Sequence, residues 1–188
     1  EAPAQSATVL AKYLDKSQFD VTAVSLRAQT GPKSLTVRQL EAAGVPHVSM
    51  QMGGFHDLRG VLRLARFIRT WRPDVVHTHA FRADFWCGIV GRVSGVRLIV
   101  NTVRNHDRHV FQMEHPYLVG KLAVAASRFA TAVADAVVAV SAGVGHYLVD
   151  EERVPPSKVH VIPNGFDFDR LLECNGERST VRAALRWQ

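Results

Sequence analysis

Short apolar runs alternate with amphipathic segments along most of this chain. The apolar runs are rich in Val and Ile and apolar on both faces, which is typical of strands buried between helices in a parallel sheet. They cover residues 19–26, 45–50, 74–79, 96–103, 136–141 and 158–163. Apolar residues at helical spacing predict helices between them, over 34–43, 57–71, 81–94, 116–134 and 142–152. With Gly or Pro at the joints, this alternation predicts an α/β fold, a Rossmann-like doubly wound parallel sheet.

Both ends of the chain depart from this alternation. Residues 5–14 predict a helix with no strand before it, although a βαβ sheet normally starts with a strand. Residues 177–188 begin another amphipathic helix. We therefore expect an internal piece of a longer polypeptide, whose unpaired sheet edge and uncovered apolar surface favour self-association.

The composition is that of an ordinary soluble protein, with 47% apolar and 21% charged residues. Apolar stretches end well short of the roughly 18 to 20 residues that cross a bilayer, and the first residues do not resemble a signal peptide. Cys87 and Cys174 make no disulfide framework, so a reducing cytoplasm is expected. We expect neither cysteine to be catalytic or to bind a metal.

The net charge of +6 is concentrated in one part of the chain. Between Asp57 and Arg108 there are ten Arg, no Lys and four Asp, whereas the remaining residues carry 13 basic and 13 acidic side chains. Because Arg binds carboxylates and phosphates through a planar fork, this pattern indicates an anionic surface or ligand. Scattered solvated faces are the simpler alternative.

The predicted helix over 57–71 carries the densest part of this charge. We expect Leu58, Val61, Leu62, Ala65 and Ile68 to face the sheet, and Arg59, Arg63 and Arg66 to form a basic face. An ordinary sheet-covering helix explains this pattern. Alternatively, Leu64, Phe67 and Trp71 dip into an anionic membrane surface while the arginines bind head groups. No recognition motif for nucleic acid is present, so no nucleic-acid partner is expected.

His77 and His79 end the strand predicted over 74–79. Strand side chains alternate faces, so both histidines point the same way at the carboxyl end of the strand, where open α/β sheets bind ligands. Two such histidines could hold zinc with His106, His109 or His115, but no Cys or H-E-x-x-H motif supports this, and no metal is expected. Binding of sugar hydroxyls or a phosphate, or a structural role, are the alternatives.

The next strand ends in a polar loop at the same predicted edge of the sheet. Arg104, Asn105, His106 and Asp107 should emerge there beside His79. The cleft so formed suits a polyhydroxylated or phosphorylated ligand and lacks the nucleophile and base of a hydrolase. Ser141, at a later strand-to-helix junction, is predicted to cap the helix that follows.

Three segments together resemble the N-terminal domain of family 4 glycosyltransferases with the GT-B fold. They are RPDVVHTHAFRADFWCGIVGRVSGVRLIVNTVRN, ADAVVAVSAGVGHYL and VPPSKVHVIPNGFDFDRL, in this order and spacing. The most specific piece is VIPNGFD, which in that family joins the last strand of the N-terminal domain to a second Rossmann-like domain. The resemblance implies one half of a GT-B fold, with residues 1–163 as the N-terminal domain and 164–188 as linker and start of the next domain.

The resemblance also implies a function. Such enzymes are retaining and metal-independent, need no cofactor, and move a hexosyl unit from a nucleotide-sugar donor, held mainly by the C-terminal domain, to an acceptor. The acceptor would be a glycan or a lipid-linked molecule of the cell envelope, reached from the cytoplasmic face of the plasma membrane. Carried over by motif, His79, Arg82, Asp84 and Asn105 line the acceptor side and His77 supports the strand. Asn164 and Gly165 are hinge or cleft residues.

This sequence also departs from the family pattern. Many members carry a histidine where Arg104 stands, so Arg104, with His106, is predicted to stabilise charge or bind an anionic acceptor group instead of acting as a base. The Gly-rich loop that approaches the donor diphosphate and the donor domain are not recognised in these residues. The 188 residues alone should therefore be inactive. The alternative is a non-catalytic module that binds glycan or anionic lipid.

Overall fold

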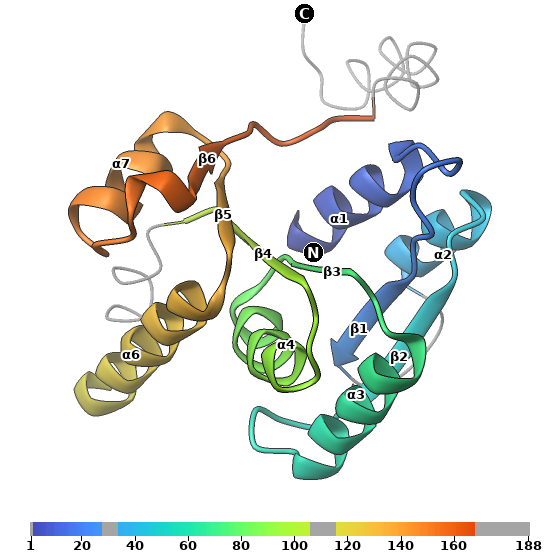
Figure 1. The fold of residues 1–188 in the computed structure, drawn as a ribbon, viewed down its shortest axis with the longest axis horizontal. Helices are drawn as coiled ribbons and strands as arrows, with labels where there is room; N and C mark the ends of the chain where they lie inside the picture. The colour runs from blue at the N-terminus through green and yellow to red at the C-terminus, as the bar shows by residue number, and fades with distance from the viewer. Residues whose placement is uncertain (1, 28–33, 106–115, 168–188) are drawn as a thin grey trace, which may run out of the picture.

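The predicted alternation of strands and helices is present in the structure, a computed structural model that describes residues 2–27, 34–105 and 116–167. Figure 1 shows the elements in chain order. The strands are β1 (Ala23–Arg27), β2 (His47–Met52), β3 (Val75–Thr78), β4 (Leu98–Val103), β5 (Ala136–Ala139) and β6 (Val159–Val161). The helices are α1 (Ala2–Tyr13), α2 (Leu35–Ala42), α3 (Leu58–Trp71), α4 (Phe81–Val93), α6 (Tyr117–Val133), α7 (Ala142–Asp150) and the short 3₁₀ helix η1 (Pro156–Lys158). The α/β fold class is thus confirmed.

All strand pairs of the described residues are parallel, but they form two separate ladders. β1 pairs with β2, and a second sheet has the order β3-β4-β5-β6. The predicted parallel pairing is confirmed, and the unpaired sheet edge that the sequence predicts appears as a break between the two ladders. In the doubly wound order 3-2-1-4-5-6, one strand lies between the strands that correspond to β1 and β3. The break falls at that position, where no described strand pairs with either edge.

Helices cover the strands in layers. α3, α4 and α6 pack side by side, and α1 packs against α2 (Figure 1). The main core lies between the strands and these helices, and its most deeply buried side chains are Met52, Leu64, Ile99 and Val137. Because parallel strands are joined by helices that return, the start of each helix and the end of the preceding strand meet at one sheet edge. That edge carries the candidate site.

Side-chain caps fix where the helices begin. Ser141 Oγ accepts from Val144 N at 3.3 Å, so the predicted cap of α7 is confirmed. Asp57 Oδ1 accepts from Gly60 N at 3.0 Å at the start of α3, and its Oδ2 accepts from Gly53 N at 3.0 Å. These N–H groups hold the pKa of Asp57 below its ordinary value. Asp57 thereby ties the loop after β2 to α3.

The orientation of α3 differs from the prediction. Leu64 is 1% exposed and faces the core, whereas Leu58 and Leu62, predicted to face the sheet, are 68% and 69% exposed. Phe67 is half-buried against the core and stacks on Trp71, with ring centroids 5.8 Å apart. Leu64 is therefore wrong as a lipid-facing candidate, whereas the roles of the half-buried Phe67 and the exposed Trp71 stay predictions.

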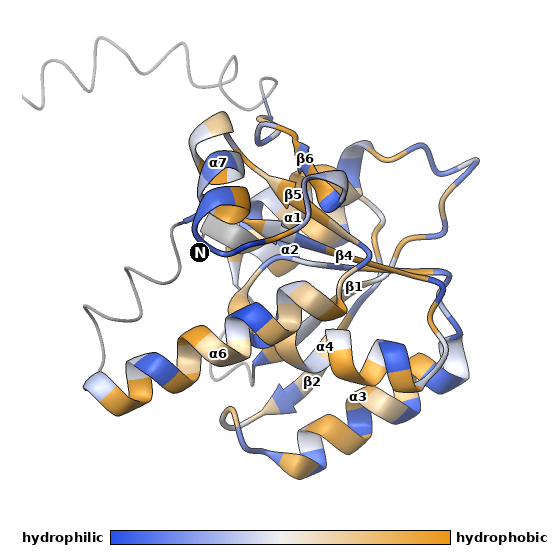
Figure 2. Cartoon of the chain, turned by 60° about the vertical axis from the view of Figure 1, so that its left-hand side comes forward, coloured by the Kyte–Doolittle hydropathy of each residue, from blue (hydrophilic) through white to orange (hydrophobic). Residues whose placement is uncertain are grey.

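The arginines of α3 also divide into two kinds. Arg63 donates to the carbonyl oxygens of Met50 and Gln51, at 2.9 and 3.0 Å, and so braces β2. Arg59 and Arg66 lie on the exposed side of α3 with Leu58 and Leu62, where Figure 2 shows polar and apolar residues side by side. None of the described helices is long and apolar enough to cross a membrane.

After β6 the chain crosses back to α1 (Figure 1). Asp167 accepts from Lys12 Nζ at 2.8 Å and from Tyr13 OH at 2.9 Å. Asn164 and Gly165 are exposed on this crossing segment, and a Cβ on Gly165 would lie 3.5 Å from Val9. Their role as hinge residues stays a prediction, and residues 168–188 lie outside the described part of the chain.

Candidate functional site

His77 of β3 and His79, directly after this strand, lie together at the carboxyl edge of the sheet. Their ring centroids are 4.3 Å apart, which confirms that His77 and His79 share a face. His77 Nε2 lies 2.7 Å from Thr102 Oγ1 on the neighbouring strand β4. Although His77 is exposed at one side, desolvation of its ring and then the nearby charge of Arg104 lower its pKa. His77 thus joins β3 to β4, as the strand-supporting role predicted.

Arg104, just after β4, is bound to His79. Its guanidinium donates to the His79 carbonyl oxygen at 3.1 Å and approaches His79 Nδ1 at 2.9 Å. Because a guanidinium only donates, Nδ1 must accept, and the neutral ring carries its proton on Nε2. Burial, then the neighbouring charges of His77 and Arg104, lower the pKa of His79 to about 3. His79 is therefore a neutral imidazole at physiological pH.

A buried polar cluster supports these residues from below. Thr78 Oγ1 lies 3.0 Å from Asn101 Oδ1 and is also hydrogen-bonded to Asp84. Asn101, 1% exposed, donates through Nδ2 to the carbonyl oxygen of Ala130 on α6 at 3.3 Å. This cluster joins β3, β4, α4 and α6 directly beneath the histidine pair, so it holds the edge of the sheet rigid.

Asp84 takes part in that cluster instead of lining an open surface. Its side chain lies in the first turn of α4, is 8% exposed and is bound to Thr78. Its negative charge acts on Arg104, which opposes the effect of burial on the pKa of that guanidinium. Contrary to the expectation, Asp84 therefore does not line an open acceptor surface. It holds Thr78 inside the buried cluster.

Two buried guanidinium nitrogens at this edge have no hydrogen-bond partner in the described part of the chain. They are Arg104 Nε and Arg82 Nη1. Arg82 lies in the first turn of α4, which starts two residues after His79 and whose N-cap, Ala80, offers no side-chain cap. Buried N–H groups of this kind are satisfied by water or a ligand in working proteins.

An aromatic cluster, which the sequence analysis did not single out, adjoins the start of α4. Phe55, in the loop after β2, stacks on Phe81 with ring centroids 5.6 Å apart, and contacts Phe85 at 5.2 Å. Phe85 in turn lies 6.0 Å from Phe129 of α6.

An exposed apolar stripe runs along α6 and includes Phe129. Its residues follow one another at helical spacing and are Leu118, Leu122, Ala125 and Phe129. Figure 2 shows apolar residues along much of α6. Polar donors and apolar surface thus adjoin at one edge.

A metal site receives no support from this geometry. No group of three potential ligands occurs among the described residues. In addition, His79 Nδ1 faces the positive charge of Arg104, which disfavours a cation at that nitrogen. His106, His109 and His115, considered as third ligands, lie outside the described residues.

The remaining predicted residues are placed as follows. Asn105 is exposed directly after Arg104, and the second catalytic candidate, His106, lies outside the described residues. Cys87 is buried, and burial raises the pKa of its thiol to about 12, so the thiol is unreactive. Cys174 also falls outside the described part of the chain.

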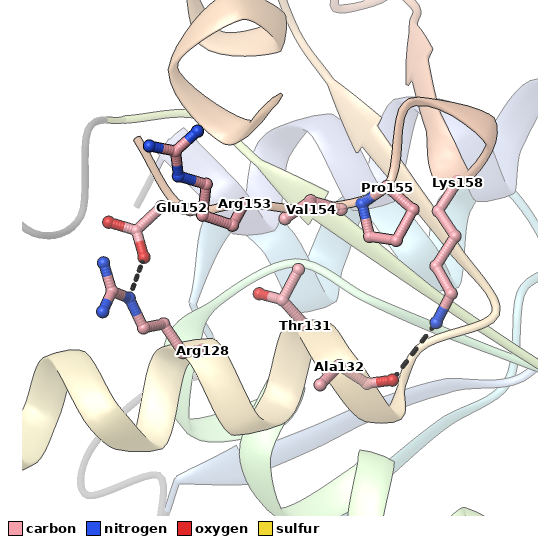
Figure 3. A pocket seen from close by; sticks show the side chains of 8 residues that line it. All are labelled: Arg128, Thr131, Ala132, Glu152, Arg153, Val154, Pro155 and Lys158. Carbon is pink, nitrogen blue, oxygen red and sulfur yellow. Dashed lines mark hydrogen bonds and ion pairs between the residues drawn. The ribbon is translucent and has the colours of Figure 1, made fainter. Parts of the chain in front are cut away.

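A cavity of about 80 Å³ lies elsewhere, at the carboxyl end of α6 (Figure 3). Three of the charged side chains that line it are already paired, those of Arg128, Glu152 and Lys158. Arg128 Nε donates to Glu152 at 2.6 Å, and Lys158 Nζ donates to the carbonyl oxygens of Ala132 and Ala134 at 3.2 and 2.8 Å. These contacts cap α6 with a positive charge and join it to the loop after α7. The cavity has a structural explanation.

Thr78, Asn101 and Thr102 are the supporting residues that sequence reasoning missed. Their signal was present, because Asn101 and Thr102 interrupt a run that is otherwise Leu, Ile and Val. A polar residue in the interior of a buried strand needs a hydrogen-bond partner. Two in succession, one strand away from a histidine pair, indicate a polar network between the strands.

The fold and this polar edge define a Rossmann-like lobe of the kind found in glycosyltransferase structures. The Anabaena protein Alr3699/HepE, crystallised with UDP and glucose, matches with a TM-score of 0.68 and 20% identity over 98% of this chain and 47% of its own. A glycosyltransferase from Rickettsia africae matches with a TM-score of 0.61 and 17% identity, over 97% of this chain and 45% of its own.

The model of Glycosyltransferase Family 4 matches residues 4–170, and the chain belongs to this family. Among curated proteins, the Escherichia coli UDP-Gal:alpha-D-GlcNAc-diphosphoundecaprenol alpha-1,3-galactosyltransferase is 24% identical over 162 residues, which is 85% of this chain and 40% of that protein. The chain thus spans less than half the length of the relatives that it matches.

Proposed function

We propose that this chain is the acceptor-binding half of a retaining, metal-independent glycosyltransferase. In this proposal a second lobe brings a nucleotide-sugar donor, and the acceptor lies over His79 and Arg104. The observation that carries the proposal is the joined pair itself: Arg104 held on His79, at the carboxyl edge of a parallel sheet, in a member of Glycosyltransferase Family 4. Closure of the second lobe would exclude water before the donor leaving group departs.

The acceptor in this proposal is a lipid-linked molecule of the cell envelope. The E. coli relative, whose name specifies a diphosphoundecaprenol-linked acceptor, supports this choice. So does the apolar surface that runs from Phe85 to Phe129 and along α6, because it would accommodate hydrocarbon next to the polar edge. The exposed side of α3 would rest on the cytoplasmic face of the membrane through Leu58, Leu62, Arg59 and Arg66.

The test is transfer by the product of the complete reading frame. UDP-galactose and UDP-glucose are offered with short-chain lipid-linked and free saccharide acceptors, and released UDP and glycosylated product are both measured. We expect product with at least one lipid-linked acceptor. His79→Ala should lower kcat/KM by about tenfold or more, because the imidazole and its contact with Arg104 are lost. Release of no nucleotide with any donor or acceptor would contradict the proposal and favour a non-catalytic binding module.

A further inference from the structure

We propose that Arg104 and His79 form an oxoanion site that binds a phosphoryl group of the acceptor. This inference rests on the proposed function, because it names the chemical class of acceptor that the lobe receives. It would make Arg104 a residue that determines acceptor specificity.

One edge of the Arg104 guanidinium has no hydrogen-bond acceptor among the described residues. Two of its N–H groups are spent on the carbonyl oxygen and Nδ1 of His79, at 3.1 and 2.9 Å, so the group cannot rotate freely. Its Nε is buried and has no acceptor among the described residues. Leaving a buried charged donor unpaired is costly, and an oxoanion on this edge would remove that cost.

The second step is that the neighbouring groups also donate. The contact with Arg104 leaves the proton of His79 on Nε2, so this ring offers a donor. Arg82 Nη1 is a further buried N–H without a described partner. α4, which contains Arg82, begins immediately after His79 and Ala80, and the start of a helix carries partial positive charge.

The third step is that this set of groups selects an anion. A sugar hydroxyl both donates and accepts, and therefore suits a mixed site, whereas these unpaired groups are all donors. Asp84 is the nearby carboxylate, and its oxygen is already bound to Thr78 inside the buried cluster. A tetrahedral phosphoryl group can accept from donors that arrive from several directions, and a planar guanidinium matches two of its oxygens.

Binding is tested first on the 188-residue chain, with inorganic pyrophosphate as the probe. The affinity is measured by calorimetry, and the Arg104 Nε–H resonance is followed by NMR. We expect this resonance to shift, Arg104→Gln to weaken binding by about tenfold or more, and Arg104→Lys, which keeps the charge without the fork, to weaken it less. The matched control is Arg97→Gln, because Arg97 is exposed just before the opposite end of β4.

Several results of this titration would overturn the inference. Equal binding by the wild-type chain and Arg104→Gln would do so, as would an equal loss in Arg97→Gln. Tighter binding of glucuronate than of pyrophosphate would indicate a carboxylate site instead. If Arg104→Gln unfolds at a lower temperature, Arg104→Lys and the resonance shift in the wild-type chain still decide the question.

Transfer by the complete gene product then separates the acceptor from the donor. With matched acceptors that carry or lack a phosphate, Arg104→Gln should raise the KM of the phosphorylated acceptor and leave the KM of the nucleotide-sugar unchanged. A rise only in the KM of the nucleotide-sugar would assign the site to the donor and refute the inference, while the proposed function would stand. Absence of transfer would refute the proposed function, whereas the pyrophosphate titration would still report on the site.

Discussion

The guanidinium of Arg104 binds both the backbone and the ring of His79, at 3.1 Å from the carbonyl oxygen and 2.9 Å from Nδ1. The contact at Nδ1 requires the neutral imidazole, because a guanidinium can only donate. Burial, then the neighbouring charges of His77 and Arg104, hold the pKa of His79 at about 3. Protonating His79 in the folded chain would remove the contact between Arg104 and Nδ1. The free energy of unfolding must therefore depend on pH.

The sign follows from the two pKa values. In the unfolded chain His79 takes up a proton below about pH 6.5, whereas in the folded chain it stays neutral down to about pH 3. Stability is therefore complete above pH 6.5 and falls as the pH decreases, by about 1 kcal/mol between pH 7 and 5.5 for this residue. His79→Asn should flatten this part of the curve in urea unfolding experiments. The exposed His160→Asn serves as the control and should keep the wild-type slope.

Asn101 should be essential to the stability of the candidate site. It is 1% exposed and connects Thr78 to the carbonyl oxygen of Ala130. Asn101→Ala removes both hydrogen bonds and leaves a small cavity, which should cost about 2 to 4 kcal/mol in the free energy of unfolding. The exposed Asn105→Ala should change it by less than about 0.5 kcal/mol. Equal melting temperatures for the two variants would contradict this account of the cluster.

The sequence predicted the strands and the meeting of His79 with Arg104 for a simple reason. Strands that are apolar on both faces indicate a parallel sheet, and the carboxyl ends of parallel strands share one edge. Thr78, Asn101 and Asp84 could not be joined in the same way, because their contacts depend on the exact packing of α4 and α6 against the strands. The order of strands and helices along the chain predicts which edge of the sheet a residue occupies. The packing of the helices against the strands then decides whether its side chain is exposed there.

The rotation of α3 shows a second limit of the hydrophobic pattern. Apolar residues occur on several sides of this helix, at 58, 61, 62, 64, 65 and 68, so the pattern allows more than one buried face. In the structure, Gly60 determines the choice, because a Cβ at Gly60 would lie 2.3 Å from Met52 Cγ. The close approach of the backbone to β2 requires this glycine and places Leu64 in the core.

Gly60→Ala should therefore destabilise the chain although alanine favours helices. Met52 is completely buried and cannot move aside freely, so we expect a net loss of about 1 to 3 kcal/mol in the free energy of unfolding. Gly54→Ala is the control, since nothing lies within 4 Å of a Cβ there. In the Gly60→Ala background, Met52→Ala should cost less than in the wild-type chain, because it relieves the overlap. Additive effects of the two substitutions would refute the proposed contact.

The break between β1 and β3 should make this 188-residue chain self-associate. Each of these strands has one edge that no described strand pairs with, and Val75 on β3 is 46% exposed. Unpaired edges of apolar strands template further pairing. Sedimentation velocity should show oligomers that grow with concentration. Val75→Lys should reduce them, and Val93→Lys, at an exposed helical position, should not. A monodisperse monomer at high concentration would contradict this expectation.

The exposed side of α3 should bind anionic membranes through both its leucines and its arginines. Leu58 and Leu62 are more than two-thirds exposed beside Arg59 and Arg66, so hydrocarbon insertion and head-group attraction can act together. The chain should co-sediment with vesicles that contain phosphatidylglycerol and much less with phosphatidylcholine alone.

Two variants separate this surface from general charge attraction. Leu62→Glu should reduce binding by about tenfold, because it removes an insertion point and repels anionic lipid. Val93→Glu is the matched control, with the same change of charge at an exposed apolar residue, 71% exposed, at the end of α4. Both should unfold close to the wild-type temperature, since neither side chain is buried. If the two variants lose binding equally, net charge governs the attraction and α3 is not the membrane-facing surface.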